Sequence, residues 1–117
     1  MDFENDKPIY LQVVEDITSR IIAGQIEPGS KLPSSRELAV EYTINPNTAS
    51  RVYAELERRG IAFTRRGIGT FVAEGDVDDL RRERIEKAAA EFVENMRGMG
   101  LSDQEIIALV EEFIRDN

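Results

Sequence analysis

The sequence contains neither cysteine nor histidine. Without cysteine, the chain can form no disulfide, no thiolate nucleophile and no cysteine-ligated zinc site. Without imidazole, carboxylates are the main side chains left to bind a metal or to act as a general base. These absences weigh against an enzyme, and they give no reason to expect a metal or another cofactor.

Long apolar segments are absent as well. No run approaches the ~18–20 apolar residues that a membrane-spanning helix needs. The amino-terminal stretch MDFENDKPIY is acidic, unlike a signal peptide. We therefore expect a soluble, cytoplasmic protein that does not bind membranes.

The formal net charge of −8 is distributed unevenly along the 117 residues. Residues 31–72 carry seven basic and four acidic side chains, a net of +3, whereas residues 76–117 carry six basic and twelve acidic ones, a net of −6. Phosphate binding depends on a local basic patch rather than on the total charge. The acidic total therefore does not exclude a nucleic-acid-binding surface in the first part of the chain.

Two helices are predicted at the start of the chain. Pro8 suits a first helical residue, and the apolar spacing that follows indicates a helix up to Ala23. The stretch Glu27–Ser30 has the signature of a turn. Ser34 and Glu37 then have the S-x-x-E spacing of a capping box, in which each side chain satisfies a backbone N–H of the first turn. We therefore expect a second, short helix to begin at Ser34.

A third helix and a β-hairpin follow. Asn45 is a good N-cap and Gly60 a good helix stop, so a helix is expected between them. Residues 61–65 and 70–73 predict two strands, joined by a glycine-containing turn at residues 66–69. Three helices followed by a hairpin is the plan of a winged helix-turn-helix.

The rest of the chain predicts two more helices, over about residues 78–96 and after Ser102, which opens another capping box with Glu105. Between the hairpin and these helices, residues 74–76 read as a boundary. The expected fold class is mostly α with a small β-hairpin. It comprises an N-terminal winged helix-turn-helix DNA-binding domain over residues 1–75 and a helical C-terminal dimerisation segment over residues 76–117.

The third helix and the hairpin carry the candidate functional residues. In a helix-turn-helix, the second helix of the motif enters the major groove with its N-terminal residues nearest the base edges. Arg65 and Arg66 stand beside glycines at the hairpin tip, where the backbone can approach a phosphate or the minor groove. Arg36, in the helix before, can reach the same face. Double-stranded DNA is therefore the expected partner.

Three segments also carry a resemblance to a known family: PIYLQVVEDITSRIIAGQIEPGSKLPSSRELA, INPNTASRVYAELERRGI and RRGIGTFVA, which together span Pro8 to Ala73. They resemble the DNA-binding domain of the GntR family of bacterial regulators. PIYLQV, NPNT and the short two-helix end are similar to the YtrA-type subgroup of that family. The resemblance implies a dimeric, usually repressing transcription factor, here expected to bind a palindromic operator through the recognition helix and the wing.

Carried over onto this sequence, the resemblance implies DNA contacts by nine residues: Arg36, Asn45, Asn47, Thr48, Ser50, Arg51, Arg65, Arg66 and Gly67. Many family members have basic residues at the positions of Pro46 and Ser50, so this chain has fewer arginines suited to read guanine. For Asn45, the role of helix cap is an equal alternative.

Other prominent side chains have a structural interpretation. Arg58 and Arg59 end a helix, where positive charge suits the helix dipole. Tyr10, Tyr53 and Phe63 are expected to face the core.

The apolar side chains of the C-terminal helices need a partner. An antiparallel pair that is too small to be stable alone is predicted from the apolar residues Phe92, Val93 and Met96 on one helix and Ile106, Val110 and Phe113 on the other. A second copy would bury these faces and place two recognition helices on a two-fold symmetric operator. One alternative is a monomer whose tail packs on its own head; another is a protein-interaction module that has lost DNA binding. A small-molecule effector is left open, at the dimer interface or between tail and head.

Overall fold

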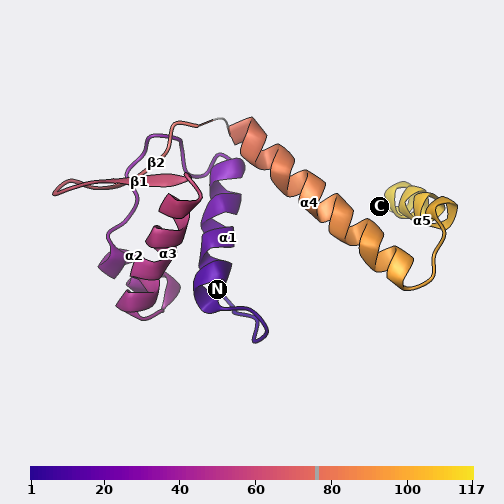
Figure 1. Cartoon of the computed structure of the whole chain (residues 1–117), viewed down its shortest axis with the longest axis horizontal. Helices are drawn as coiled ribbons and strands as arrows, with labels where there is room; N and C mark the ends of the chain where they lie inside the picture. The colour runs from indigo at the N-terminus through magenta and orange to yellow at the C-terminus, as the bar shows by residue number, and fades with distance from the viewer. Residues whose placement is uncertain (76) are drawn as a thin grey trace. The chain divides into compact units, whose positions relative to one another are not determined.

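The computed structural model describes residues 1–75 and 77–117. Within them the chain forms five helices and one β-hairpin (Figure 1): α1 (Ile9–Ile22), α2 (Ser35–Tyr42), α3 (Pro46–Arg58), β1 (Ala62–Arg65), β2 (Gly69–Val72), α4 (Val77–Gly98) and α5 (Asp103–Asp116). The predicted fold class, mostly α with a small hairpin, is confirmed. The chain divides into two units, Met1–Asp78 and Asp79–Asn117. This division lies close to the boundary expected at residues 74–76, of which Asp76 lies outside the described residues.

The first unit is built around one apolar core. Apolar residues three or four positions apart lie on one face of a helix, so α1, α2 and α3 each turn such a face inward. The largest fully buried side chains come from all three helices and from β2: Val13, Val14, Leu38, Val52, Leu56 and Val72. Each such side chain contributes ~1.5–3 kcal/mol when it leaves water. This cluster is therefore the main force that holds the three helices and the hairpin together.

The ends of the helices follow local signals in the sequence. Ser34 Oγ accepts a hydrogen bond from the backbone N–H of Glu37 (3.1 Å), and Glu37 Oε1 accepts one from the backbone N–H of Ser34 (3.0 Å). The predicted capping box is thus confirmed. The prediction that Pro8 is the first helical residue is wrong by one position. Its ψ of 137° is extended, so Pro8 is the N-cap and the helical conformation begins at Ile9.

The hairpin is joined by a third extended segment. β1 and β2 pair antiparallel, with Phe63 opposite Phe71. On the other edge of β2, the N–H of Leu32 donates to the carbonyl oxygen of Thr70 (2.7 Å), and the N–H of Val72 donates to that of Ser30 (2.9 Å). The sequence does not predict this pairing, because residues 27–30 look locally like a turn and their partners lie far along the chain. The added segment fixes the base of the hairpin to the chain before α2.

The second unit contains almost no buried side chain. Among the described residues, α4 has none and α5 has one, Ile106. The predicted capping box of α5 is confirmed, since Ser102 Oγ accepts a hydrogen bond from the backbone N–H of Glu105 (3.2 Å). Exposed and half-buried apolar side chains and the chain end instead surround a hollow of about 670 Å³, lined by Phe92, Met96, Leu109, Val110, Phe113, Ile114 and Asn117.

The two helices of this unit do not form the expected antiparallel pair. Figure 1 draws α4 from the side and α5 almost end-on, so their axes point in different directions. In the connection between them, Gly100 has a φ of 90°, and Arg97 Nε lies 2.9 Å from Asp103 Oδ1. None of the described helices is both long enough and apolar enough to cross a membrane.

Candidate nucleic-acid interface

The turn between α2 and α3 sets the position of α3. Thr43 adopts a left-handed conformation with a φ of 54°, and the N–H of Ile44 then donates to the carbonyl oxygen of Ala39 (2.9 Å). On α3, the hydroxyl of Tyr53 donates to the carbonyl oxygen of Pro33, just before α2. Burial raises the pKa of Tyr53 above its ordinary value, so this hydroxyl stays protonated and remains a donor. These contacts hold α2 and α3 together as one helix-turn-helix.

The recognition helix α3 has one apolar and one polar face. Its buried residues are Ala49, Val52, Tyr53 and Leu56. Asn47, Ser50 and Arg51 are exposed, and Thr48 is half-buried at the border between the two faces. Four side chains that the sequence assigns to DNA are therefore within reach of a ligand at the N-terminal end of α3. Asparagine, serine and threonine side chains at such a place can exchange hydrogen bonds with base edges and phosphates.

Asn45 has a structural task of its own. Its side-chain oxygen accepts a hydrogen bond from the backbone N–H of Asn47 (2.8 Å), which makes it the N-cap of α3. Pro46 follows as the first helical residue, where its missing N–H costs nothing. The cap interaction uses the oxygen of the Asn45 amide and leaves its NH₂ group to the exposed surface.

Arg51 stacks on an aromatic ring of another helix. The guanidinium carbon lies 3.9 Å from the centroid of the Tyr10 ring, at the start of α1. Tyr10 is half-buried at the edge of the core, so its ring is held by packing on one side and covered by Arg51 on the other. The guanidinium is thereby tied to the junction between α1 and α3.

The wing presents two arginines and a glycine at its tip. Arg65, Arg66 and Gly67 are all exposed. The N–H of Ile68 donates to the carbonyl oxygen of Arg65 (2.9 Å), and Gly67 has a φ of 79°, a conformation that favours glycine. No heavy atom lies within 4 Å of a Cβ placed on Gly67, so its glycine character serves the backbone conformation rather than packing.

An aromatic pair supports one of these arginines. The rings of Phe63 and Phe71 stack at 5.7 Å, and the Arg65 guanidinium lies 5.6 Å and 5.8 Å from their centroids. The expectation that Phe63 faces the core is wrong, since 37% of it is exposed. Successive side chains of a strand point to opposite faces. Ala62 takes the core side of β1, which leaves Phe63 on the outer face of the wing.

Ion pairing divides the cations of residues 31–72 into two groups. Arg59 Nη1 lies 3.0 Å from Glu15 Oε1, and Arg58 and Arg59 both bind Glu55. The structural interpretation of these two arginines is thus supported by carboxylates that neutralise them. The other five cations form no ion pair with any carboxylate in the described part of the chain: Lys31, Arg36, Arg51, Arg65 and Arg66.

Lys31 belongs to this second group, although no sequence motif marks it as a candidate. It lies in the segment that pairs with β2, opposite Phe71. A Cβ placed on Gly69 would lie 2.6 Å from Lys31 Cε, so the lysine side chain passes directly over the wing. The only available signal was its place in the locally basic stretch. Four of the unpaired cations lie in α2, α3 or the wing, and Lys31 lies against the wing.

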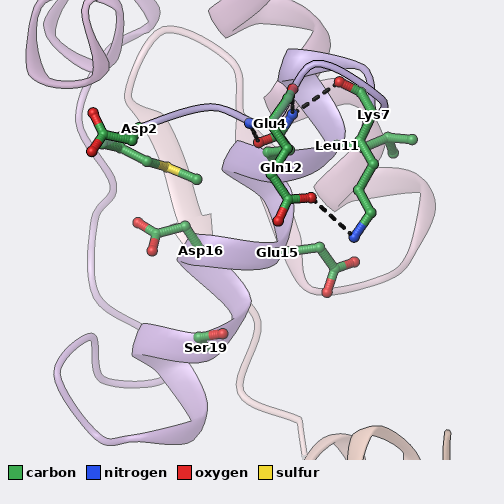
Figure 2. Close-up of a pocket in the computed structure, with 9 residues that line it drawn as sticks. Asp2, Glu4, Lys7, Leu11, Gln12, Glu15, Asp16 and Ser19 are labelled. Atoms are coloured by element: carbon green, nitrogen blue, oxygen red, sulfur yellow. Dashed lines mark hydrogen bonds and ion pairs between the residues drawn. The ribbon is translucent and has the colours of Figure 1, made fainter. Parts of the chain in front are cut away.

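A hollow beside α1 has the opposite charge. It measures about 350 Å³, and Figure 2 shows Asp2, Glu4, Glu15 and Asp16 around it. Gln12 closes it by anchoring the N-terminal residues: its side chain accepts the N–H of Glu4 (2.8 Å) and donates to the carbonyl oxygens of Glu4 (2.8 Å) and Lys7 (2.9 Å). Carboxylates repel phosphate, so this hollow is poorly suited to hold a nucleic-acid backbone.

Residues 9–72 match a family model described as "Bacterial regulatory proteins, gntR family". The chain is 42% identical over 113 residues to the uncharacterized HTH-type transcriptional regulator YhcF of Bacillus subtilis. This alignment covers 95% of this chain and 93% of YhcF. It is 46% identical over 74 residues to the HTH-type transcriptional repressor YtrA of the same organism. That alignment covers 63% of this chain and 57% of YtrA.

Solved structures share the same architecture. A GntR family transcriptional regulator from Listeria monocytogenes has a TM-score of 0.86 at 38% identity, covering 94% of this chain and 98% of its own. The structure of AraR(DBD) in complex with operator ORX1 has a TM-score of 0.55 at 32% identity, covering 62% of this chain and 89% of its own. The similarity to the Listeria protein therefore includes the C-terminal helices, whereas the similarity to AraR(DBD) spans less of the chain.

Proposed function

Because the chain belongs to the GntR family of bacterial regulatory proteins, we propose that it is a homodimeric transcriptional repressor that binds a palindromic operator through α3 and the wing. The resemblance inferred from the sequence, including that to the YtrA-type subgroup, is confirmed. Members of this family are DNA-binding regulators and not enzymes, as the sequence predicted.

The observation that carries the proposal is the set of five cations on α2, α3 and around the wing that form no ion pair within the described residues. An ion-paired arginine must break its pair before it binds phosphate, whereas an unpaired one only exchanges water and counterions. The likeness to AraR(DBD), which was solved in complex with an operator, supports DNA as the ligand of this surface.

Within this proposal the contact residues have different roles. Asn47, Thr48 and Ser50 read base edges in the major groove, because they stand at the leading end of the recognition helix. The cations hold the duplex by its phosphates, and Gly67 lets the wing tip approach the minor groove. Residues 1–75 form the DNA-binding part. A regulator of chromosomal DNA works where the DNA is, so the proposal places the protein in the cytoplasm.

The dimer is supported by the exposed apolar side chains of residues 76–117. Phe113 is 63% exposed and Ile114 is 70% exposed, and both line the hollow of the second unit. Leaving such large apolar groups in water costs ~1.5–3 kcal/mol each. A second copy that covers them would bring two α3 helices to the two halves of a symmetric operator. An effector could then bind only where the paired chains leave room, and no particular ligand is proposed.

Selection of bound sequences from a random pool of duplex DNA, followed by a salt titration on the selected site, tests the proposal. We expect two inverted half-sites. Each neutralised phosphate contributes about −0.9 to the slope of log K against log salt, so ten unpaired cations per dimer set a limit near −9. No enrichment, or a slope near zero, would contradict DNA binding. Enrichment of a single, unrepeated half-site would contradict the dimer.

A further inference from the structure

We propose that Tyr10 is a positioning residue for DNA binding: its ring holds the guanidinium of Arg51 in the orientation in which Arg51 contacts a phosphate of the bound duplex. This inference rests on the proposed function and extends it to α1, which lies outside both the helix-turn-helix and the wing. Tyr10 itself touches Arg51 and not the DNA.

The stacking geometry supports this role. The distance of 3.9 Å between the Arg51 guanidinium and the Tyr10 ring is the shortest of the four such contacts in the described residues, the others being 5.6–5.8 Å. A guanidinium that lies on a ring uses its flat face and keeps the N–H groups of its edge free. That edge is the part that binds phosphate with two parallel hydrogen bonds.

The charges around Arg51 leave it free to bind an anion. Glu55 lies one turn further along α3, but it is bound by Arg58 and Arg59, which together hold its pKa low, at about 2. Glu15, on the α1 side, accepts a hydrogen bond from Arg59 (3.0 Å). Glu55 and Glu15 are thus engaged with other arginines, and no ion pair joins Arg51 to a carboxylate of the described residues.

Holding the side chain in place should also increase its affinity for phosphate. A free arginine loses conformational freedom when it binds, and this loss reduces the net gain of the contact. The Tyr10 ring restricts Arg51 before DNA arrives, so less freedom remains to be lost.

A second stacked arginine in the same unit provides a matched control. Arg20 lies 5.6 Å from the ring of Tyr42, but it also pairs with Asp16 and Glu41, at 3.3 Å each. Arg20 therefore stacks on an aromatic ring, as Arg51 does, but its positive charge is neutralised by carboxylates. Its replacement should leave DNA binding unchanged.

The test is a double-mutant cycle measured on the DNA site selected with the wild-type chain. We expect R51A to make the salt slope less steep by about 0.9 for each protomer. Y10L should weaken binding by roughly 2–5-fold for each protomer, the effect of one exposed cation–π contact. Y10F keeps the ring and should bind like the wild type. In the R51A background, Y10L should cause no further loss. R20A should keep the wild-type slope.

Unfolding by urea, followed for every variant, separates positioning from folding. If Y10L does not fold, Y10M takes its place, since a flexible methionine fills irregular space. An equal loss of affinity from the Tyr10 substitution with and without R51A would mean that the ring acts through the fold and would overturn the inference, as would wild-type affinity of Y10L. If the wild-type chain itself selects no sequence, the proposed function fails instead.

Discussion

The side-chain oxygen of Asn45 accepts the backbone N–H of Asn47 at 2.8 Å, and this single contact starts the recognition helix. Removing it in N45A should lower the free energy of unfolding by about 1 kcal/mol, the usual cost of losing an N-cap. N45D should keep the stability, because aspartate caps equally well, yet it should weaken DNA binding by placing a negative charge at the groove. Urea unfolding and operator titration measure the two effects. If N45D were as unstable as N45A, the capping role would be wrong.

Base preference should depend on the exposed residues that follow the cap. Substitution of Asn47 or Thr48 by alanine removes groups that can exchange hydrogen bonds with bases, and a good contact of this kind discriminates by about 1–3 kcal/mol. Repeating the selection from random DNA with N47A and T48A should yield altered half-sites. R58A, at the other end of α3, is the control and should select the wild-type site. Unchanged half-sites with N47A and T48A would remove these residues from base recognition.

The wing arginines should contribute affinity without sequence preference. R65A/R66A removes four cations from a dimer, so the salt slope should become less steep by up to about 3.6. R58A/R59A removes the same number of arginines, but these are already paired with Glu55 and Glu15. It should change the slope little. Equal slopes for the two double variants would show that ion pairing does not decide which arginines bind DNA.

The C-terminal hollow should be the place where two copies meet. F113E puts a charge among the apolar side chains that line it and should convert the dimer to a monomer in sedimentation experiments. Affinity for a single half-site should persist, whereas the added affinity for the palindrome is lost. E112Q changes an exposed neighbour and should stay dimeric. A dimeric F113E would move the interface elsewhere.

Low pH should remove the contribution of Glu55 to the free energy of unfolding. Arg58 and Arg59 lower the pKa of this carboxylate from 4.5 to about 2 by hydrogen bonding to it. Since the folded-state pKa lies below the unfolded one, the stabilisation is complete above about pH 4.5 and disappears as the pH falls through about 2. E55Q should therefore be less stable than the wild type at pH 7, by a modest amount because water screens the largely exposed Arg58. Urea unfolding at pH 2 should give equal stabilities; a difference that persists there would assign the effect to packing.

The fold follows the sequence where its signals are local. The capping boxes at Ser34 and Ser102 involve residues only three positions apart, so the sequence alone specifies them. The pairing of Leu32 with Thr70 depends on two distant segments meeting in the folded chain. The turn signal at residues 27–30 gave no indication of this strand-like pairing. The different directions of α4 and α5 are likewise not visible in the apolar spacing of either helix.

The same distinction applies to the candidate site. The sequence places polar side chains on the open face of α3 because the apolar spacing fixes its buried face. It does not say which arginines are neutralised, since Arg59 meets Glu15 across two helices, nor that Arg51 stacks on Tyr10. Lys31 was missed for the same reason, as its place over the wing depends on long-range pairing.

The 22-residue helix α4 has no buried side chain of its own. Under the proposed pairing, the second copy supplies the packing that keeps this helix folded, so its stability obeys mass action and rises with protein concentration. The cellular abundance of the chain then enters the regulation directly. Dilution of the protein, as in a growing and dividing cell, would dissociate the dimer and at the same time destabilise the C-terminal helices. Operator occupancy would then fall more steeply than the protein concentration.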